Sequence, residues 1–267
     1  MTGPGEPDRA AGPATDFWDH LGATFPSLKG AASTAYYARC ERRLLRELFP
    51  KLAGQVLFKT DLWDEAKNTE ILRWAAEQGA LPVGVDVAFD IVREARAVLG
   101  EHRPRLAVAD VRALPFRPGS FDLVYSMGTI EHFPEYASAV AEVFRVLRPG
   151  GTVIVGVPNK LDPFLRPLLV HFLNLAGRYD YGMEKSFTPG ALRRLLEGAG
   201  FRVTRTTGIL FVPGWLRMLD LWCHTRARPL GRLTGWLVGP FAWLYERVPA
   251  VRRHGYLIAC AAEKPPG

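Results

Sequence analysis

Residues 54–90 read GQVLFKTDLWDEAKNTEILRWAAEQGALPVGVDVAFD, and this stretch decides the fold. The apolar run QVLF predicts a short buried strand, the segment from Leu62 to Gln78 predicts a helix that Gly79 stops, and PVGVDV predicts a second strand. A strand, a helix and a strand in this order form a parallel βαβ unit, which is typical of nucleotide-binding folds. The turn after the first strand, FKTDLWDEAK, contains no glycine, which is unusual for such a unit.

Strands and helices alternate along the rest of the chain. Helices are predicted over 33–49, 89–99, 136–147 and 189–199, from apolar residues at helical spacing. Strands are predicted at RLAVAD (105–110), FDLVYS (121–126), TVIVGVP (152–158), FRVTRTTG (201–208) and GYLIACAAE (255–263). This alternation implies an α/β fold with a mainly parallel sheet that helices cover on both faces.

The composition is that of a globular intracellular protein. Of 267 residues, 48% are hydrophobic and 11% aromatic, enough for a substantial core. The three cysteines, Cys40, Cys223 and Cys260, are odd in number and scattered, which argues against a disulfide framework or a metal site and suits a reducing cytoplasm. Residues 1–15 are rich in Gly, Pro and Ala and lack an apolar core segment, so we expect a disordered tail rather than a signal peptide.

The positive charge belongs to one segment. Residues 202–253 contain nine arginines and two acids, which accounts for the whole formal charge of +7. The segment has no lysine and no recognised nucleic-acid-binding motif, and its apolar content is high. Any function of this charge therefore belongs to residues 202–253, and nucleic-acid binding is not expected.

Polar or flexible residues stand at the carboxyl ends of four predicted strands. Lys59, Thr60 and Asp61 follow the first strand, Asp86 and Asp110 end the second and third, and Ser126, Met127 and Gly128 end the fourth. Ligands of parallel sheets bind at these ends. Three acids there would repel a phosphate but would suit a cationic ligand that carries ribose hydroxyls. Asp86 could accept hydrogen bonds from those hydroxyls, and Asp110 could accept one from the amine of a purine. Each acid alone could equally be a helix N-cap or a solvated turn.

Residues 107–159 carry a family resemblance. The matching elements are Asp110 followed by LPF, then FDLV, then IEHF, then LRPGG before a strand. Their order and spacing resemble class I S-adenosylmethionine-dependent methyltransferases of the type 11 small-molecule group, and with flanking strands the resemblance covers 54–207 and 255–263. It implies a Rossmann-like, doubly wound, mostly parallel seven-stranded sheet with an antiparallel last strand. N-terminal helices and a helical insertion before that strand complete the expected fold.

The resemblance also implies that S-adenosyl-L-methionine is the cofactor. The residues expected to bind it are Lys59, Thr60, Asp61, Asp86, Val87, Asp110, Val111, Ser126, Met127 and Gly128. The family usually places an acid and two or three glycines after the first strand, whereas this chain has FKTDLWDE. Either a variant loop grips the phosphate-free cofactor through side chains, or the site is lost and the protein is a non-catalytic scaffold. We favour the variant loop because Asp86 and Asp110 are retained.

The acceptor side is less well defined by the sequence. His132, which follows Glu131, is the candidate general base, and its alternative role is packing near the cofactor. Aromatic and acidic residues expected around the acceptor are Tyr36, Tyr37, Glu131, Tyr179, Tyr181 and Phe187. For each aromatic residue, core packing is the alternative. The identity of the acceptor and the methylated atom stay open.

The insertion of residues 208–250 is the most distinctive segment. It separates the two parts of the expected catalytic core (51–207 and 251–264), and residues 16–50 form an N-terminal helical segment. The insertion holds four of the seven tryptophans, but arginines interrupt every apolar run before the ~20 residues that a bilayer span needs. Tryptophan, leucine and arginine together suit a membrane interface, which would place the protein at the inner face of the membrane. A lid over a hydrophobic acceptor and a homodimer face are the alternatives.

Overall fold

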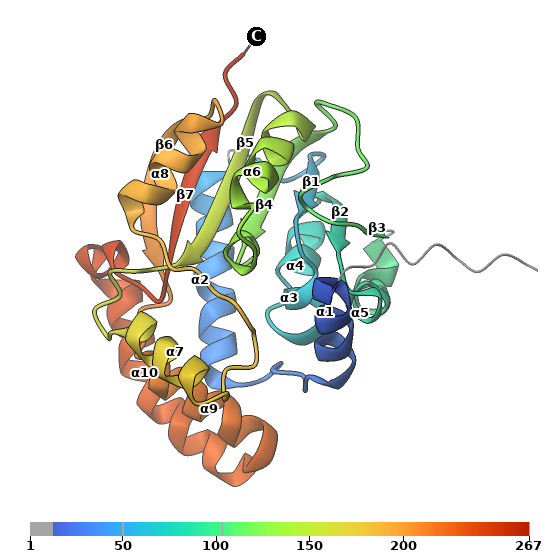
Figure 1. Cartoon of the computed structure of the whole chain (residues 1–267). Helices are drawn as coiled ribbons and strands as arrows, with labels where there is room; N and C mark the ends of the chain where they lie inside the picture. Colours follow the sequence, from blue (N-terminus) through green and yellow to red (C-terminus); the bar gives the residue numbers. More distant parts are fainter. Residues whose placement is uncertain (1–12, 50, 103, 267) are drawn as a thin grey trace, which may run out of the picture.

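The computed structural model describes residues 13–49, 51–102 and 104–266, and its centre is a seven-stranded sheet (Figure 1). The strands are β1 (Val56–Lys59), β2 (Leu81–Asp86), β3 (Arg105–Val108), β4 (Phe121–Met127), β5 (Leu147–Pro158), β6 (Arg202–Ile209) and β7 (Leu257–Glu263). Their order is β3-β2-β1-β4-β5-β7-β6, with β7 antiparallel to both neighbours and the pairings among β1–β5 parallel. The predicted sheet, including its antiparallel last strand, is confirmed.

Helices cover both faces of this sheet. On one face lie α2 (Ala32–Leu48), α3 (Trp63–Lys67), α4 (Ile71–Glu77) and α5 (Phe89–Leu99), and on the other lie α6 (Tyr136–Val146) and α8 (Pro189–Gly198). The remaining α-helices are α1 (Pro13–Thr24), α7 (Arg166–Leu175), α9 (Gly214–Arg226) and α10 (Gly231–Arg247). Short 3₁₀ helices are η1 (Gly100–His102), η2 (Ile130–His132), η3 (Arg228–Leu230) and η4 (Pro249–Arg253). The predicted tail of 1–15 lies mostly outside the described residues, and α1 begins at its end.

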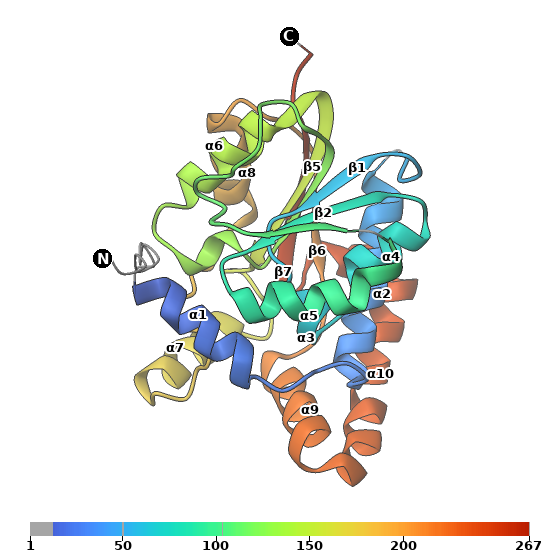
Figure 2. The ribbon, with the colours of Figure 1, turned by 90° about the vertical axis from the view of Figure 1, so that its right-hand side faces the viewer.

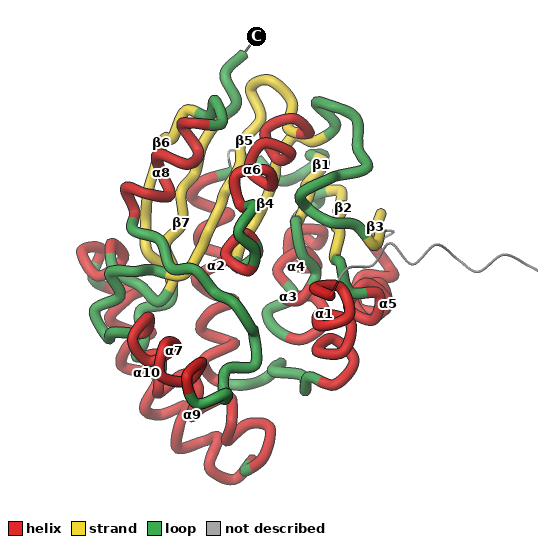
Figure 3. The backbone as a smooth tube through the Cα atoms, in the orientation of Figure 1, coloured by secondary structure: helices red, strands yellow, loops and turns green. Residues whose placement is uncertain are grey.

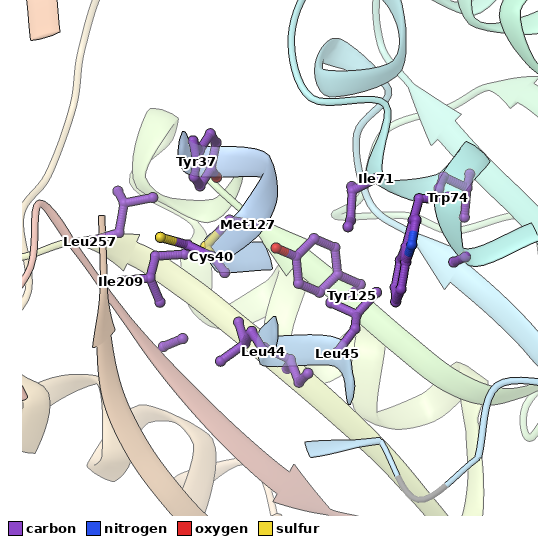
Figure 4. Close-up of a cluster of buried hydrophobic side chains, with 14 of the residues drawn as sticks. Tyr37, Cys40, Leu44, Leu45, Ile71, Trp74, Tyr125, Met127, Ile209 and Leu257 are labelled. Atoms are coloured by element: carbon purple, nitrogen blue, oxygen red, sulfur yellow. The ribbon is translucent and has the colours of Figure 1, made fainter. Parts of the chain in front are cut away.

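The two faces of the sheet have separate apolar cores because side chains alternate along each strand. On the α2 face, Tyr125 lies in the middle of the cluster with Leu45 and Trp74 beside it (Figure 4). Its hydroxyl donates to Glu41 Oε1 at 2.7 Å, which gives this buried hydroxyl a partner within the core. On the α6 face, Phe58 stacks on Phe121 with ring centroids 4.6 Å apart.

The helix predicted from Leu62 to Gln78 is in fact two helices, and this part of the prediction is wrong. The break lies at Asn68, whose side-chain amide donates to Asp64 Oδ1 at 2.9 Å and whose Oδ1 accepts from Thr34. Glu70 then takes a left-handed conformation with φ of 55°. Asparagine competes with the helical backbone through such side-chain bonds, so α3 ends after five residues.

A buried lysine holds the loop between β1 and α3. Lys59 is completely inaccessible to solvent. Its Nζ lies 2.9 Å from Asp61 Oδ1, 3.2 Å from Asp64 Oδ2 and 3.4 Å from Glu65 Oε2, and it also donates to the Asp61 carbonyl at 3.1 Å. Burial alone would lower the pKa of Lys59, but the three carboxylates outweigh burial and hold the pKa well above its ordinary value. The loop is therefore shaped by one internal cation instead of by glycines.

Helices α9 and α10 form the insertion before β7 and lie below the sheet beside α7 (Figures 1 and 2). One buried carboxylate joins them to α2. Asp220 of α9 accepts from the Ser33 amide in the first turn of α2 at 2.7 Å and from the Thr234 hydroxyl of α10 at 2.6 Å. Loops and the short helix η4 connect this helical group to the sheet (Figure 3).

We expect Lys59→Met to lower the free energy of unfolding by about 3–5 kcal/mol, because it leaves Asp61, Asp64 and Glu65 buried without their counter-charge. Chemical denaturation followed by circular dichroism measures this. Arg73→Met is the matched control: Arg73 makes exposed ion pairs on α4, so its loss should cost less than about 0.5 kcal/mol. Equal losses in the two variants would contradict a structural role for the Lys59 cluster.

Candidate active site

A cavity of about 300 Å³ lies where β1, β2, β4 and β5 end. Its sheet side is lined by residues that follow the strands: Thr60, Asp61, Asp86, Val87, Asp110, Val111, Met127, Gly128 and Pro158. Its other side is lined by residues from α7, α9 and the segment between α7 and α8: Arg166, Arg178, Tyr179, Asp180, Tyr181, Glu184, Arg217, Met218 and Leu221. The volume lies at the lower end of the range for small-molecule sites.

Asp86 ends β2 and organises two adjoining turns. Its Oδ2 accepts from the Leu62 amide and its Oδ1 from the Ala88 amide, each at 2.9 Å. Burial raises the pKa of Asp86 to about 6, although the two amides oppose this. A carboxylate has about four lone-pair directions, so Asp86 keeps acceptor capacity toward the cavity.

Asp110 lies at the predicted place but is already ion-paired. Arg112 Nη2 approaches Oδ2 at 2.6 Å, and Arg112 Nε lies 3.0 Å from Oδ1 and 2.9 Å from Oδ2. Burial opposes ionisation of Asp110, but Arg112 outweighs it and lowers the pKa. Arg112, which also pairs with Glu135 at 3.0 Å, therefore competes for these acceptor sites, and nothing in the sequence pattern predicts this pairing.

Thr60 and Asp61 occupy the place of the glycine loop. The Thr60 hydroxyl donates to Ser126 Oγ at 2.8 Å, and Asp61 Oδ2 accepts from the Thr129 hydroxyl at 2.9 Å. Asp61 is not the N-cap of the next helix, because Leu62 holds that position without a side-chain cap. Burial raises the pKa of Asp61, with Lys59 opposing it.

The structure corrects four predicted site residues, none of which lines the cavity. Lys59 cannot donate to a ligand because its ammonium is enclosed by carboxylates, and Ser126 is buried beneath Thr60. The Tyr36 hydroxyl bonds to the backbone of Phe211 at 3.1 and 3.3 Å. Phe187 packs in the core of the α6 face. For both aromatic residues, core packing was the correct alternative.

Tyr37, Glu131, His132, Tyr179 and Tyr181 do line the cavity. The Nδ1 of His132 lies 3.0 Å from the Met183 carbonyl, so Nδ1 carries the proton and Nε2 is left as an acceptor. Burial lowers the pKa of His132. Burial, with the nearby Glu184, raises the pKa of Glu131 well above its usual value, and Glu131 Oε2 has no hydrogen-bond partner among the described residues.

An aromatic wall was missed by the sequence analysis. Trp63 of α3 lies 5.1 Å from Phe25, 5.9 Å from Tyr181 and 6.5 Å from Trp18, between ring centroids. Trp18 of α1 also makes an edge contact with His132 at 5.0 Å. Tyr181 was among the predicted acceptor residues, but no sequence pattern around Trp18, Phe25 and Trp63 indicates a pocket.

The second missed feature is a group of arginines. Arg166 of α7 pairs through both Nη atoms with Glu184, at 2.5 and 2.7 Å, and its guanidinium carbon lies 4.1 Å from the Tyr256 ring centroid. Arg217 of α9 lies over the rings of Tyr37 and Tyr256 at 5.1 and 5.3 Å. Arg217 belongs to the segment 208–250, for which a membrane contact, a lid or a dimer face was expected, and the structure places it at the cavity.

The carboxyl groups on the sheet side of the cavity fit the positive charge of S-adenosylmethionine. Asp61, Asp86 and Glu131 all have raised pKa values, so a cation placed among them would be stabilised and would favour their ionised forms. The buried Oε2 of Glu131 receives no hydrogen bond from any described residue, so it could accept one from a ligand. Among the described residues no group of three or more His, Cys, Asp or Glu side chains could hold a metal ion.

The comparisons with known proteins agree with this geometry. The family model described as a methyltransferase domain matches residues 68–155. A probable S-adenosylmethionine-dependent methyltransferase of Mycolicibacterium smegmatis is 34% identical over 49% of this chain and 52% of its own length. The malonyl-[acyl-carrier protein] O-methyltransferase of Geobacter sulfurreducens is 32% identical over 65% of this chain and 67% of its own length.

A solved structure shares the fold at low sequence identity. The methyltransferase in a complex with the Haloferax volcanii Trm112 methyltransferase activator superposes with a TM-score of 0.64, at 18% identity, over 95% of this chain and 98% of that chain. The chain spans about half to two thirds of the length of the curated relatives it matches. By fold, motifs and relatives, the chain belongs to the class I S-adenosylmethionine-dependent methyltransferases of the type 11 group.

Proposed function

We propose that the protein transfers a methyl group from S-adenosylmethionine to a small-molecule acceptor with an apolar part. One observation carries this proposal: the cavity has strand-end acids on its sheet side and borders α9 on its other side. The acids suit the cationic donor, and Tyr181, Met218 and Leu221 give the other side an apolar lining. A donor and an amphiphilic acceptor can therefore meet in one cavity.

The protein's contribution is mainly alignment. S-adenosylmethionine supplies an electrophilic methyl group on a sulfonium that is already a good leaving group. Asp86 would accept from the ribose hydroxyls, and Thr60 and Asp61 would hold the aminocarboxylate end. The wall of Trp63, Trp18 and Tyr181 would exclude water. Correct positioning of two reactants can contribute roughly 7–11 kcal/mol to lowering the barrier.

His132 is the candidate general base for an acceptor that must lose a proton. Its neutral ring, with Nδ1 bonded to the Met183 carbonyl, leaves Nε2 free to accept that proton. The lowered pKa keeps the ring neutral at physiological pH. The name of the Geobacter sulfurreducens relative, an O-methyltransferase, supports a hydroxyl or carboxyl oxygen as the methylated atom.

We also propose that α7, α9 and α10 contact an anionic membrane at its cytoplasmic face. Each helix has an exposed apolar stripe at helical spacing, which we call the apolar surface: Leu165, Leu168, Phe172 and Leu175 on α7, Trp215, Leu219 and Trp222 on α9, and Leu233, Trp236, Leu237 and Trp243 on α10. Trp236 is 78% exposed. Exposed arginines at the α9–α10 turn, Arg226, Arg228 and Arg232, complement anionic lipid.

The helical hairpin would lie on a membrane rather than cross it. None of the helices in the described part of the chain is both long and apolar enough to span a bilayer. Tryptophan favours the headgroup region, and each arginine near an anionic surface contributes on the order of 1 kcal/mol. The free, buried cysteines Cys40, Cys223 and Cys260 suit a reducing compartment, which supports the cytoplasmic side.

Binding of S-adenosylhomocysteine should depend on the ionisation of Asp86. Asp86→Asn should weaken binding at pH 7.5 by tenfold or more, because the ribose hydroxyls lose a charged acceptor. For the unaltered protein, affinity should fall below about pH 6, since the Asp86 carboxylate, with its pKa of about 6, is then protonated. Isothermal titration calorimetry at pH 5.5 and 7.5 measures both effects, and the variant should lose this pH dependence.

Asp90→Asn is the matched control, because Asp90 in the first turn of α5 does not line the cavity and pairs with Arg93. Absence of S-adenosylhomocysteine binding by the unaltered protein would favour the non-catalytic scaffold and end the enzyme proposal. If binding is seen, incubation of cell extract with methyl-deuterated S-adenosylmethionine and mass spectrometry for labelled products identifies the acceptor.

Vesicle flotation tests the membrane contact. The protein should float with vesicles that contain phosphatidylglycerol, and much less with pure phosphatidylcholine or in 0.5 M salt, because salt screens the arginines. Trp236→Ala combined with Trp243→Ala should lower the floated fraction several-fold without changing the unfolding temperature, since both side chains are largely exposed.

Phe89→Ala is the control for this variant, because Phe89 is equally exposed but lies on α5, away from the apolar surface. Failure to float with anionic vesicles removes the membrane proposal. If sedimentation then shows a dimer that the double tryptophan variant dissociates, the apolar surface is covered by a second copy instead.

A further inference from the structure

Arg217 is a buried cation without an anion. Its residue is only 9% exposed, it lines the cavity, and its Nη1 has no hydrogen-bond partner in the described structure. No carboxylate of the described residues lies within ion-pair distance of its guanidinium, in contrast to Arg166 at the same side of the cavity. Glu184 pairs with Arg166 instead and also accepts from the Tyr179 hydroxyl.

The surroundings of Arg217 offset only part of the cost of burying it. Removing an ion from water remains costly after the surroundings relax. The rings of Tyr37 and Tyr256 lie 5.1 and 5.3 Å from the guanidinium carbon and attract it by cation–π interaction. A residue that costs stability in the free protein and points into a cavity is typical of a binding site.

We propose that Arg217 binds an anionic group, a carboxylate or a phosphate, of a ligand in this cavity. This inference rests on the proposed function and narrows its ligands. The guanidinium offers a planar pair of donors that matches such groups. The two sides of the cavity then have opposite preferences: acids on the sheet side take a cationic group, and Arg217 on the α9 side takes an anionic one.

Two sources could supply the anion. The methyl acceptor could carry it, which would make the acceptor an anionic amphiphile, or the carboxylate of the methionine part of the donor could reach Arg217 past Tyr37. Four probes separate them: S-adenosylhomocysteine, methylthioadenosine, which lacks the aminocarboxylate, octyl phosphate below its micellar concentration, and uncharged octyl glucoside.

The test compares Arg217→Gln and Arg217→Lys by calorimetry and thermal unfolding. Arg217→Gln should lose about 10- to 100-fold in affinity for the anionic probe that Arg217 binds, and Arg217→Lys should retain part of it. The unfolding temperature of the ligand-free Arg217→Gln protein should stay equal or rise, because an unpaired buried charge is removed. Arg193→Gln is the control, since Arg193 makes an exposed pair on α8.

The pattern of losses identifies the source. If Arg217→Gln binds S-adenosylhomocysteine more weakly but methylthioadenosine as before, Arg217 binds the carboxylate of the methyl donor. If the variant binds octyl phosphate more weakly but S-adenosylhomocysteine and octyl glucoside as before, Arg217 binds the anionic group of the acceptor. The proposal is overturned if the unaltered protein binds neither anionic probe, or if Arg217→Gln changes the affinity for neither of them. It is also overturned if the ligand-free variant has a lower unfolding temperature and its affinity for all four probes falls together. If the unaltered protein binds octyl phosphate through Arg217 but not S-adenosylhomocysteine, the anion site stands and the methyltransferase function fails.

Discussion

The ion cluster around Lys59 determines how this chain builds its cofactor side. The usual solution after the first strand is a glycine-rich turn, in which the backbone itself approaches the ligand. Here one enclosed ammonium draws Asp61, Asp64 and Glu65 together and fixes the loop from inside. Asp61 and Thr60 are thereby held at the cavity, and Asp86 locks the Leu62 amide from the neighbouring strand. Side chains replace glycines without disturbing the order of the sheet.

The cavity that results is electrostatically divided. Its sheet side concentrates carboxyl groups with raised pKa values. Its α9 side includes the two buried arginines Arg166 and Arg217, of which Arg166 is neutralised by Glu184. A cation with an apolar purine suits the first side, while tyrosine rings and Arg217 make the second side suitable for an amphiphile. The same helix, α9, presents Arg217 inward and Trp215, Leu219 and Trp222 outward. One helix thus contributes both to the lining of the cavity and to the exposed apolar surface.

The sequence predicted the sheet well because alternation and strand-end acids are local patterns. Helix α5 has the predicted bounds, and Asp86 and Asp110 lie where strand ends were expected. Failures arose wherever a long-range contact decided the outcome. Lys59 was expected to bind the ligand, because the sequence does not show that three carboxylates surround its ammonium. The predicted helix breaks at Asn68, whose side chain is bonded to Thr34, 34 residues earlier. In the sequence, Arg217 cannot be told apart from the exposed arginines of the same segment. It faces inward because of the way α9 packs against α2.

Asp220 has a mechanical consequence. By accepting from both Ser33 and Thr234, this buried carboxylate couples the α9–α10 hairpin to the first turn of α2, and α2 is itself anchored in the sheet core. The hairpin is therefore a fixed wall and not a hinged cover. A shift of the hairpin would therefore have to carry the first turn of α2 with it.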